Sequence, residues 1–571
     1  MAESVLKLLS ARAEVAVRAA FGPEVEVPDP LVLPSRDPRH GDYTCTAAMA
    51  LARTLRAAPL ALAGRLASAL DVADVCEPPE VSAPGFVNLR LRPDWLADHL
   101  AGDLVERTAH PETVVLDYSA PNVAKHMHVG HLRSTVIGDC LGNVYEALGH
   151  GVERVNHVGD WGTQFGMLVA HLDERGPDGG DGDEEQDLEA LYQEANARFK
   201  DDESFRERAR GRVVDLQSGE ATARAIWTGL VERSRREFDS VYELLGVHRL
   251  VERGESFYEP MLAEVVAELE AKGLVVVDDG AKCVFVPGFT NKDGDPLPLI
   301  VQKADGGYNY ASTDLAALRH RVVEEGADRV LYVVDIGQSQ HLQMVFAVAR
   351  MAGWIPDGVV VRHVPFGLVL GEGGKRMRTR SGASVRLIDL LREAVARAAL
   401  FITARAEERG EAPPDDVAEI ARVIGVGAVK YYELSQYRTS NYEFSFDRML
   451  SLKGNTAPYL QYAYARIRSI LREGGEGKGP LVLQEPQEIE LAKRLAALPD
   501  VLDRVVADDA PNHLCTYLFE VSQAYNSFYE HCPVLRSEEP VRTSRLYLCA
   551  LTAESLRSGL ALLGIDVVER I

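Results

Sequence analysis

The sequence predicts a multidomain α/β chain with a doubly wound parallel sheet, an N-terminal α+β domain and a C-terminal α-helical bundle. Three observations lead to this prediction. The chain has 571 residues, more than one domain usually holds. Buried-strand and helical patterns alternate between about residues 111 and 385. Helical periodicity alone dominates from about 386 to 571.

The composition describes a globular protein without a membrane segment. Hydrophobic residues make up 46% of the chain and charged residues 26%. No apolar run is long enough to span a bilayer, and the N-terminus lacks the basic start of a signal peptide. The seven cysteines are scattered and odd in number, which favours reduced thiols and a cytoplasmic location.

The net charge of −24 bears on the kind of partner. Such an acidic chain binds a nucleic acid only where its lysines and arginines gather locally. A cationic substrate suits an acidic background more easily. The charge alone does not choose between these partners.

The sequence pattern of residues 1 to 110 predicts a separate α+β domain. A helical pattern follows Gly41-Asp42-Tyr43 and runs from Ala47 to Leu55, and a second follows Pro59. The alternation from Pro84 to Leu91 is typical of a strand. From these residues alone, a small packing domain is a sufficient explanation.

The stretch from Asp117 to His131 predicts an anion site. The apolar run Val114-Val115-Leu116 indicates a buried strand, a Ser-Ala-Pro-Asn turn follows, and a helical pattern continues from Leu132. A strand, a polar turn and a helix N-terminus together favour phosphate, and Lys125 adds positive charge. His128 and His131 share a face if they are helical.

Two alternatives remain for these histidines. His-x-x-His on a helix can bind zinc, although no further ligand stands at metal spacing nearby. Unrelated surface histidines are the simpler alternative.

Gly130 has no Cβ, so a flat base or sugar can lie against it.

The next strand is predicted at Val152 to Val158, with the Gly-rich turn Gly159 to Gly166 after it, and a later buried strand is predicted at Val330 to Asp335. In a parallel sheet both turns fall at the carboxyl ends of strands, where ligands bind. Trp161 is either a core residue or part of a loop that lines a ligand site.

The segment from about 173 to 300 is predicted as an insertion in the sheet. It opens with an acid- and glycine-rich loop at 173–187 and continues with helical spacing, as in Leu188, Leu191 and Tyr192. We interpret it as mostly scaffold.

Tyr310 and Asp314 are four residues apart and share one face if they are helical. A carboxylate beside an aromatic wall suits a guanidinium group. The alternative is that Ser312, Thr313 or Asp314 caps the start of a helix.

Two later segments carry further hypotheses. The glycine-rich basic segment from Gly371 to Gly382 is either a loop that closes on phosphates or an exposed hairpin. Tyrosines between Gly454 and Arg466 either stack on unpaired RNA bases or form an aromatic helix interface, which is the more common arrangement.

These motifs resemble those of the arginyl-tRNA synthetases, which are class I aminoacyl-tRNA synthetases. His128-Val129-Gly130-His131 is similar to the family's HIGH signature, and Gly159 to Gly166 is similar to a block that marks the arginine enzyme. The basic segment resembles a degenerate KMSKS loop, with Thr379 in place of its last lysine and Lys125 at the compensating position. The resemblance runs nearly end to end.

The resemblance implies domains and residue roles. Residues 1–110 look like the additional domain that contacts tRNA, 111–385 like the Rossmann-type class I catalytic domain with its insertion, and 386–571 like the anticodon-binding DALR domain. The implied catalytic residues are Lys125, His128, His131 and Arg376. The implied ATP-binding residues are Lys125, His128, Gly130, His131, Arg376, Met377 and Arg378. The implied arginine-binding residues are Asp117, Ala120, Pro121, Asn122, His131, Tyr310, Asp314 and Gln338.

The activity implied by the resemblance is that of an arginine–tRNA ligase. ATP and L-arginine form arginyl-adenylate, and the arginyl group passes to the 3′ end of tRNA(Arg) in translation. Magnesium with ATP as substrate, no tightly bound cofactor, no membrane partner and a monomer are expected. The rival hypotheses are a paralogue that serves a side pathway or inhibitor resistance, and a non-catalytic RNA-binding relative.

Overall fold

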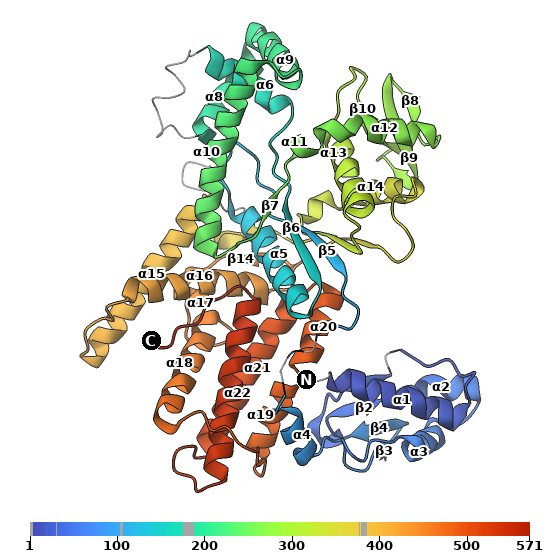
Figure 1. Ribbon diagram of the computed structural model, residues 1–571, viewed down its shortest axis with the longest axis vertical. Helices are drawn as coiled ribbons and strands as arrows, with labels where there is room; N and C mark the ends of the chain where they lie inside the picture. The colour runs from blue at the N-terminus through green and yellow to red at the C-terminus, as the bar shows by residue number, and fades with distance from the viewer. Residues whose placement is uncertain are drawn as a thin grey trace. The chain divides into compact units, whose positions relative to one another are not determined.

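The computed structural model describes residues 4–29, 31–102, 105, 107–174, 188–375, 377 and 385–570. It divides into two compact units (Figure 1). Ala109–Leu450 is called the sheet unit, and Met1–Thr108 with Ser451–Ile571 is called the terminal unit.

Five parallel strands form the main sheet of the sheet unit, in the order β12-β11-β5-β6-β7. Chain order therefore runs outward from β5 in both directions, which confirms the predicted doubly wound sheet. The strands predicted near Val114, Val152 and Val330 are β5, β6 and β11. The strands are β5 (Thr113–Asp117), β6 (Gly151–Asn156), β7 (Val251–Glu252), β11 (Arg329–Tyr332) and β12 (Val360–His363).

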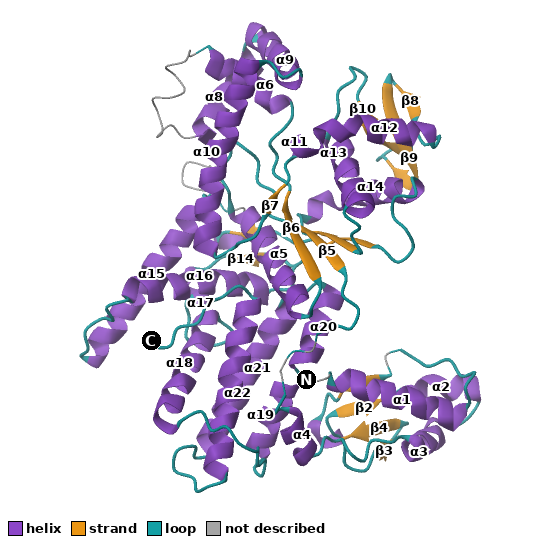
Figure 2. Ribbon diagram, in the orientation of Figure 1, coloured by secondary structure: helices purple, strands orange, loops and turns teal. Residues whose placement is uncertain are grey.

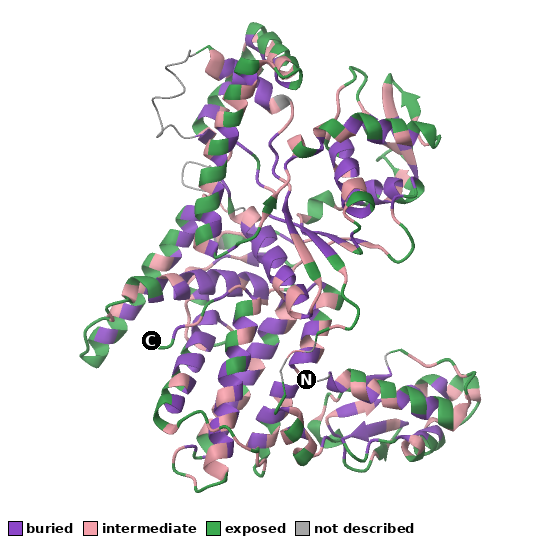
Figure 3. Cartoon of the chain, viewed as in Figure 1, coloured by how far each residue is buried: buried purple, intermediate pink, exposed green. Residues whose placement is uncertain are grey.

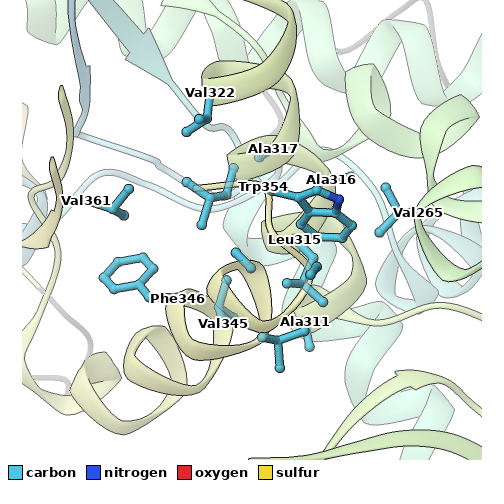
Figure 4. Close-up of a cluster of buried hydrophobic side chains, with 14 of the residues drawn as sticks. Val265, Ala311, Leu315, Ala316, Ala317, Val322, Val345, Phe346, Trp354 and Val361 are labelled. Carbon is cyan, nitrogen blue, oxygen red and sulfur yellow. The ribbon is translucent and has the colours of Figure 1, made fainter. Parts of the chain in front are cut away.

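Helices cover both faces of this sheet. On one face, α5 (Val129–Ala147) packs on β5 and β6. On the other, Val115, Val155 and Val330 join a buried cluster with α12 (Leu262–Ala271), α13 (Tyr310–Arg319) and α14 (Ser339–Met351). Figure 4 shows part of this cluster around Phe346 and Trp354. Alternate strand residues point to opposite faces, so the same strands supply both cores.

Two groups of elements are inserted between the strands of the sheet (Figure 2). The first lies between β6 and β7, and consists of α6 (Thr163–Asp173), α8 (Leu188–Asp201), α9 (Glu203–Gln217) and α10 (Ala221–Leu245). The second lies between β7 and β11, and contains α11 (Glu255–Tyr258), η2 (Glu259–Met261), α12, β8 (Val276–Asp278), β9 (Ala281–Thr290), β10 (Pro296–Gln302), α13 and the π-helical turn η3 (His320–Glu324). The antiparallel sheet β10-β9-β8 falls where the sequence patterns predict helices alone. Of the acid-rich loop, residues 175–187 lie outside the described residues.

After β12 the chain forms short strands and long helices within the sheet unit. β13 pairs with β14 in parallel. These elements are β13 (Val369–Leu370), η5 (Glu372–Gly374), α15 (Leu387–Arg409), α16 (Val417–Ser435), β14 (Tyr442–Glu443) and α17 (Phe446–Met449). Before β12, the short helix η4 (Ile336–Gln338) leads into α14. The predicted domain boundaries after residues 110 and 385 stay predictions.

The terminal unit combines a four-stranded antiparallel sheet, in the order β1-β2-β4-β3, with helices from both ends of the chain. The predicted helices after Gly41-Asp42-Tyr43 and Pro59 are confirmed as α2 and α3, although β2 comes before α2. The first segment contains α1 (Val5–Phe21), β1 (Val32–Pro34), η1 (Pro38–His40), β2 (Tyr43–Cys45), α2 (Ala47–Leu55), α3 (Pro59–Ala69), β3 (Glu80–Ser82), β4 (Phe86–Leu89) and α4 (Pro93–His99). The last segment contains α18 (Ala457–Gly474), α19 (Pro486–Ala496), α20 (Leu498–Asp508), α21 (Asn512–His531) and α22 (Val541–Leu562).

Polar contacts join the two segments of the terminal unit. Lys7 pairs with Asp503 at 2.6 Å, and Lys493 pairs with Asp42 at 2.7 Å. The hydroxyl of Ser4 donates to the Asp500 carboxylate. Figure 3 colours α21 and α22 by burial, and their inner residues are buried. Across the described ranges, no helix combines the length and the apolar composition needed to cross a bilayer.

The packing of α5 on the sheet depends on Gly138. A Cβ at this position would lie 2.2 Å from Cγ of the buried Tyr118 ring. Gly138→Ala should lower the free energy of unfolding of the sheet unit by about 1–3 kcal/mol, the usual effect of overpacking. The measurement is the denaturant midpoint.

Gly229→Ala on α10 is the matched control, because nothing lies within 4 Å of its Cβ position. It should raise stability by up to about 1 kcal/mol through helix propensity. Equal midpoints for the two variants would contradict the packing argument.

Candidate active site

The turn after β5 holds its backbone in an unfavourable conformation. Non-glycine residues with positive φ cost about 1–3 kcal/mol each and persist only where the surroundings fix them. The three residues are Ser119 (φ 74°), Ala120 (φ 46°) and Ala124 (φ 62°). Their N–H groups donate to Ser134 Oγ of α5 (2.8 Å), Asn156 Oδ1 of β6 (3.0 Å) and Ser234 Oγ of α10 (2.9 Å), respectively. Three different elements therefore fix this turn.

Backbone hydrogen bonds join this turn to the turn after β6. Gly159 N–H donates to the Pro121 carbonyl at 3.0 Å, and Val123 N–H donates to the Gly159 carbonyl at 3.1 Å. A Cβ on Gly159 would lie 2.3 Å from Asn122 Oδ1. A side chain at position 159 would therefore displace the amide of Asn122, which is exposed where the two motifs meet.

The histidines stand at the N-terminus of α5, as predicted, but His128 is the N-cap residue and lies outside the helix. Its Nδ1 accepts the Gly130 N–H at 3.1 Å, while His131 Nδ1 accepts the His128 N–H at 3.0 Å. The two rings lie 4.1 Å apart between centroids. A Cβ on Gly130 would lie 2.8 Å from the His128 ring, so only glycine permits this cap.

The capping bonds decide which protons the rings carry. A nitrogen that accepts a hydrogen bond bears no proton, so each neutral ring carries its proton on Nε2. Burial, with the neighbouring Lys125 charge, lowers the pKa of His128, and burial also lowers the pKa of His131, to about 3. Both rings are therefore neutral Nε2–H donors at pH 7.

Lys125 and the chain that follows the basic segment lie near these histidines. The Lys125 ammonium is 4.8 Å from the Tyr192 ring centroid. The backbones of Arg386 and His128 pair in an isolated antiparallel β-bridge, and Leu387 N–H donates to the Met127 carbonyl. Met377 is partly buried. The predicted ATP-binding residues Arg376 and Arg378, with Thr379, lie outside the described residues.

The acidic side of the site is formed by α13. Asn309 is the N-cap of this helix and Ser312 completes a capping box, so Ser312 does help to cap the helix start, although it is not the N-cap residue. Tyr310 is 73% exposed. Asp314 Oδ2 lies 2.6 Å from His341 Nε2, and the Tyr310 and His341 rings meet edge to face.

Asp117 at the end of β5 is only 3% exposed and pairs with the fully buried Arg321 at 2.8 Å. The Arg321 guanidinium also lies over the Tyr332 ring, 5.1 Å from its centroid. Gln338 is exposed at the start of α14, after β11. Asp117 thus already has an internal cationic partner, which the sequence did not indicate. Its role toward a substrate stays a prediction.

Glu255 is a site residue that the sequence analysis missed. Burial, with the nearby carboxylates of Asp160 and Asp314, raises its pKa to about 8. Asp160 in turn accepts hydrogen bonds from the backbone and hydroxyl of Ser256 at 2.9 and 2.5 Å. No motif surrounds Glu255 in the sequence, so only its neighbours in the fold reveal it.

These residues gather at one edge of the sheet, where β5, β6 and β11 end and the strand order reverses. Neutral N–H donors and a helix N-terminus form one side, and clustered carboxyl groups form the other. Such an edge suits an anion beside a cation. Within the part of the chain that the structure describes, no group of three or more His, Cys, Asp or Glu residues is placed to hold a metal ion.

The tyrosines of α18 divide between the two predicted roles. Tyr464 is buried and donates to Glu569 Oε1 at 2.7 Å, as in a helix interface. Tyr462 is 38% exposed, and Arg466 lies over the Tyr529 ring. Tyr462 and Arg466 therefore remain candidates for contact with RNA.

Family models match along the whole chain. The class I tRNA synthetase (R) catalytic-domain model matches residues 96–446. The arginyl tRNA synthetase N-terminal domain model matches residues 7–91, and the DALR anticodon binding domain model matches residues 460–571.

Individual relatives agree with these models. An arginine–tRNA ligase of Synechococcus elongatus is 53% identical, with 99% of each chain covered, and one of Rippkaea orientalis is 50% identical, with 96% and 97% covered. The crystal structure of the arginyl-tRNA synthetase of Plasmodium falciparum matches with a TM-score of 0.88 and 31% identity over 100% of both chains. The arginyl-tRNA synthetase of Thermus thermophilus shares the fold, with a TM-score of 0.84, 24% identity and coverage of 99% and 100%.

The protonation state of the histidines is testable. His131 should stay neutral with the proton on Nε2 from pH 8 down to about pH 5.5, because burial lowers its pKa to about 3. His128 should also carry its proton on Nε2 when neutral, with its pKa lowered by burial. Imidazole ¹⁵N chemical shifts measure this directly. His131 titrating near pH 6.5, or carrying its proton on Nδ1, would contradict the assignment.

Proposed function

The chain belongs to the arginyl-tRNA synthetases, and from this premise we propose that it is an arginine–tRNA ligase that forms arginyl-adenylate and charges tRNA(Arg). The carboxylate of arginine attacks the α-phosphorus of ATP, and pyrophosphate leaves. The arginyl group then passes to the terminal ribose of the tRNA. The substrate itself is the nucleophile, so catalysis is alignment and charge stabilisation.

ATP takes the α5 side of the site. The Nε2–H groups of His128 and His131 donate to phosphate or ribose oxygens, and the start of α5 adds its helix dipole. Lys125 faces the phosphates once it leaves the Tyr192 ring, and Gly130 lets the nucleotide approach the backbone. Arg376, Met377 and Arg378 are assigned to ATP from the sequence. Mg²⁺ arrives with ATP and keeps mostly water and phosphate ligands.

Arginine takes the acidic side. Asp314 and Glu255 are neighbouring carboxyls, and their mutual repulsion is relieved when a guanidinium lies between them. Tyr310 supplies the aromatic wall. The exposed Asn122 and Gln338, with the turn Ala120-Pro121, hold the α-carboxylate and α-amino end beside His131. Asp117 contributes indirectly, through its ion pair with the buried Arg321.

The observation that carries this proposal is the pair of opposed chemistries at one sheet edge. The grouping of the Glu255, Asp160 and Asp314 carboxyls indicates a site for a cation, and neutral N–H donors at a helix N-terminus indicate a site for an anion. An amino acid with a cationic side chain and a nucleotide satisfy both at once.

The remaining assignments concern the whole molecule. The terminal unit, which holds the matches to the N-terminal and anticodon-binding models, binds the tRNA. The protein works as a monomer in the cytoplasm. Its acidic background concentrates arginine rather than RNA, so tRNA contacts rest on local residues such as Arg466.

Pyrophosphate exchange with each amino acid, with and without tRNA, tests the proposal. Arginine should be the one amino acid that supports exchange. No exchange with any amino acid, with or without tRNA, would indicate a non-catalytic relative. Aminoacylation of bulk tRNA and rescue of a strain lacking its main enzyme then separate a translation enzyme from a paralogue with another role.

Glu255 gives the activity a specific pH dependence. Arginine binds the carboxylate form, and the free pKa is about 8, so affinity for arginine should rise as the pH increases from 6.5 to 8.5. Glu255→Gln should flatten this dependence and raise the KM for arginine about 10–100-fold, since a hydrogen bond to a charged group contributes about 1.5–3 kcal/mol. Glu259→Gln, four residues further along, serves as the control and should keep the parent profile. A Glu255→Gln enzyme with the parent's KM and pH profile would remove Glu255 from the site.

A further inference from the structure

Arg133 lies in α5, two residues after His131, and its guanidinium is fully buried. Nε donates to Glu433 Oε1 of α16 at 2.6 Å. Nη1 donates to the Ser440 carbonyl at 3.0 Å, and Nη2 donates to the Arg438 carbonyl at 3.1 Å. The rings of Tyr442 and Phe366 lie beside it, with centroids 5.2 and 5.9 Å away. Each of its three nitrogens therefore has a partner.

The two carbonyls belong to the irregular segment 436–441, which leads into β14. The same segment also bonds to the chain just before β13. Gly367 N–H donates to the Arg438 carbonyl at 2.9 Å, and Leu368 N–H donates to Asn441 Oδ1 at 2.7 Å. A Cβ on Gly367 would lie 2.7 Å from the Thr439 carbonyl oxygen, so the backbones of these two segments are in close contact. Beyond β13, Gly373 N–H donates to Glu443 Oε1 at 2.8 Å.

Stability alone gives a poor explanation of the buried ion pair between Arg133 and Glu433. Burying two charges is expensive, and apolar residues of similar volume often leave a fold equally stable or more stable. An apolar side chain cannot bond two carbonyls, however, and a lysine cannot match the rigid fork of the guanidinium. The value of Arg133 therefore lies in the geometry that it imposes on its three partners.

We propose that Arg133, held by Glu433, is a positioning residue for adenylate formation. Arg133 fixes the first turn of α5, which contains His131, against the two segments that form β13 and β14. This inference rests on the proposed function. The hydroxyl of Thr135 donates to the His131 carbonyl at 2.7 Å, so the first turn moves as one body with Arg133. A displacement of about 1 Å at reacting groups can slow a reaction about 100-fold.

The terminal unit contains a matched control pair. Arg545 Nε donates to the buried Glu488 Oε1 at 2.7 Å, and Arg545 Nη1 donates to the Pro533 carbonyl at 3.0 Å. The chemistry and burial are similar to those of Arg133 and Glu433. None of the proposed ATP- or arginine-binding residues belongs to this unit.

The test compares Arg133→Lys with Arg545→Lys in full-length protein, by arginine-dependent pyrophosphate exchange at saturating tRNA, so that weaker tRNA binding by either variant does not limit the rate. Arg133→Lys should lower kcat at least 10-fold while the KM for arginine stays within twofold, because alignment changes and the guanidinium site does not. Arg545→Lys should keep kcat within about threefold. Thermal midpoints of the two variants should fall by similar amounts.

The double variant Arg133→Met with Glu433→Leu separates positioning from folding. It should keep a thermal midpoint close to the parent's and lose exchange at least as strongly as Arg133→Lys. Parent-like kcat in Arg133→Lys would overturn the proposal, as would equal loss in Arg545→Lys or an active, folded double variant. If the double variant does not fold, the lysine pair decides. Failure of the parent to exchange arginine at all would instead overturn the proposed function.

Discussion

The site depends on one constraint, the left-handed backbone that three non-glycine residues adopt after β5. No local preference holds Ser119, Ala120 and Ala124 in this conformation, and hydrogen bonds from their N–H groups to α5, β6 and α10 must offset its cost. Tyr242 of α10 reinforces the arrangement, because its hydroxyl meets both Ser119 Oγ and Asn156 Nδ2. The turn is thus a product of the assembled sheet unit. The residues it presents, from Asn122 to His128, are fixed only when that unit has packed.

Charge is divided across the sheet edge in a way that suits an acidic chain. The proposed phosphate side combines neutral imidazoles, backbone N–H groups and one lysine, a set that suits an anion without a large positive patch. The opposite side concentrates carboxyl groups around α13 and Glu255. Asp117 would add another negative charge to this side, but Arg321 pairs with it inside the protein.

The sequence was sufficient where local pattern and topology act together. Apolar runs predicted β5, β6 and β11, and because parallel strands end at one edge, the motifs after them had to meet there. Contacts between residues far apart in the chain were not predictable. Arg321 reaches Asp117, Glu433 reaches Arg133 across 300 residues, and Glu255 acquires its altered pKa only from neighbours brought by folding. The capping of α13 by Asn309 also escaped prediction, because several adjacent polar residues can fill that role equally well in a sequence.

The terminal unit joins the first and last parts of the chain, through pairs such as Lys7 with Asp503 and Lys493 with Asp42. These partners are synthesised before and after the sheet unit. While the sheet unit is translated, the N-terminal segment therefore exists without Asp503 and Lys493, the partners of Lys7 and Asp42. A chain that stops before α18 contains the whole sheet unit but none of the later helices, so its N-terminal segment lacks both of these ion pairs.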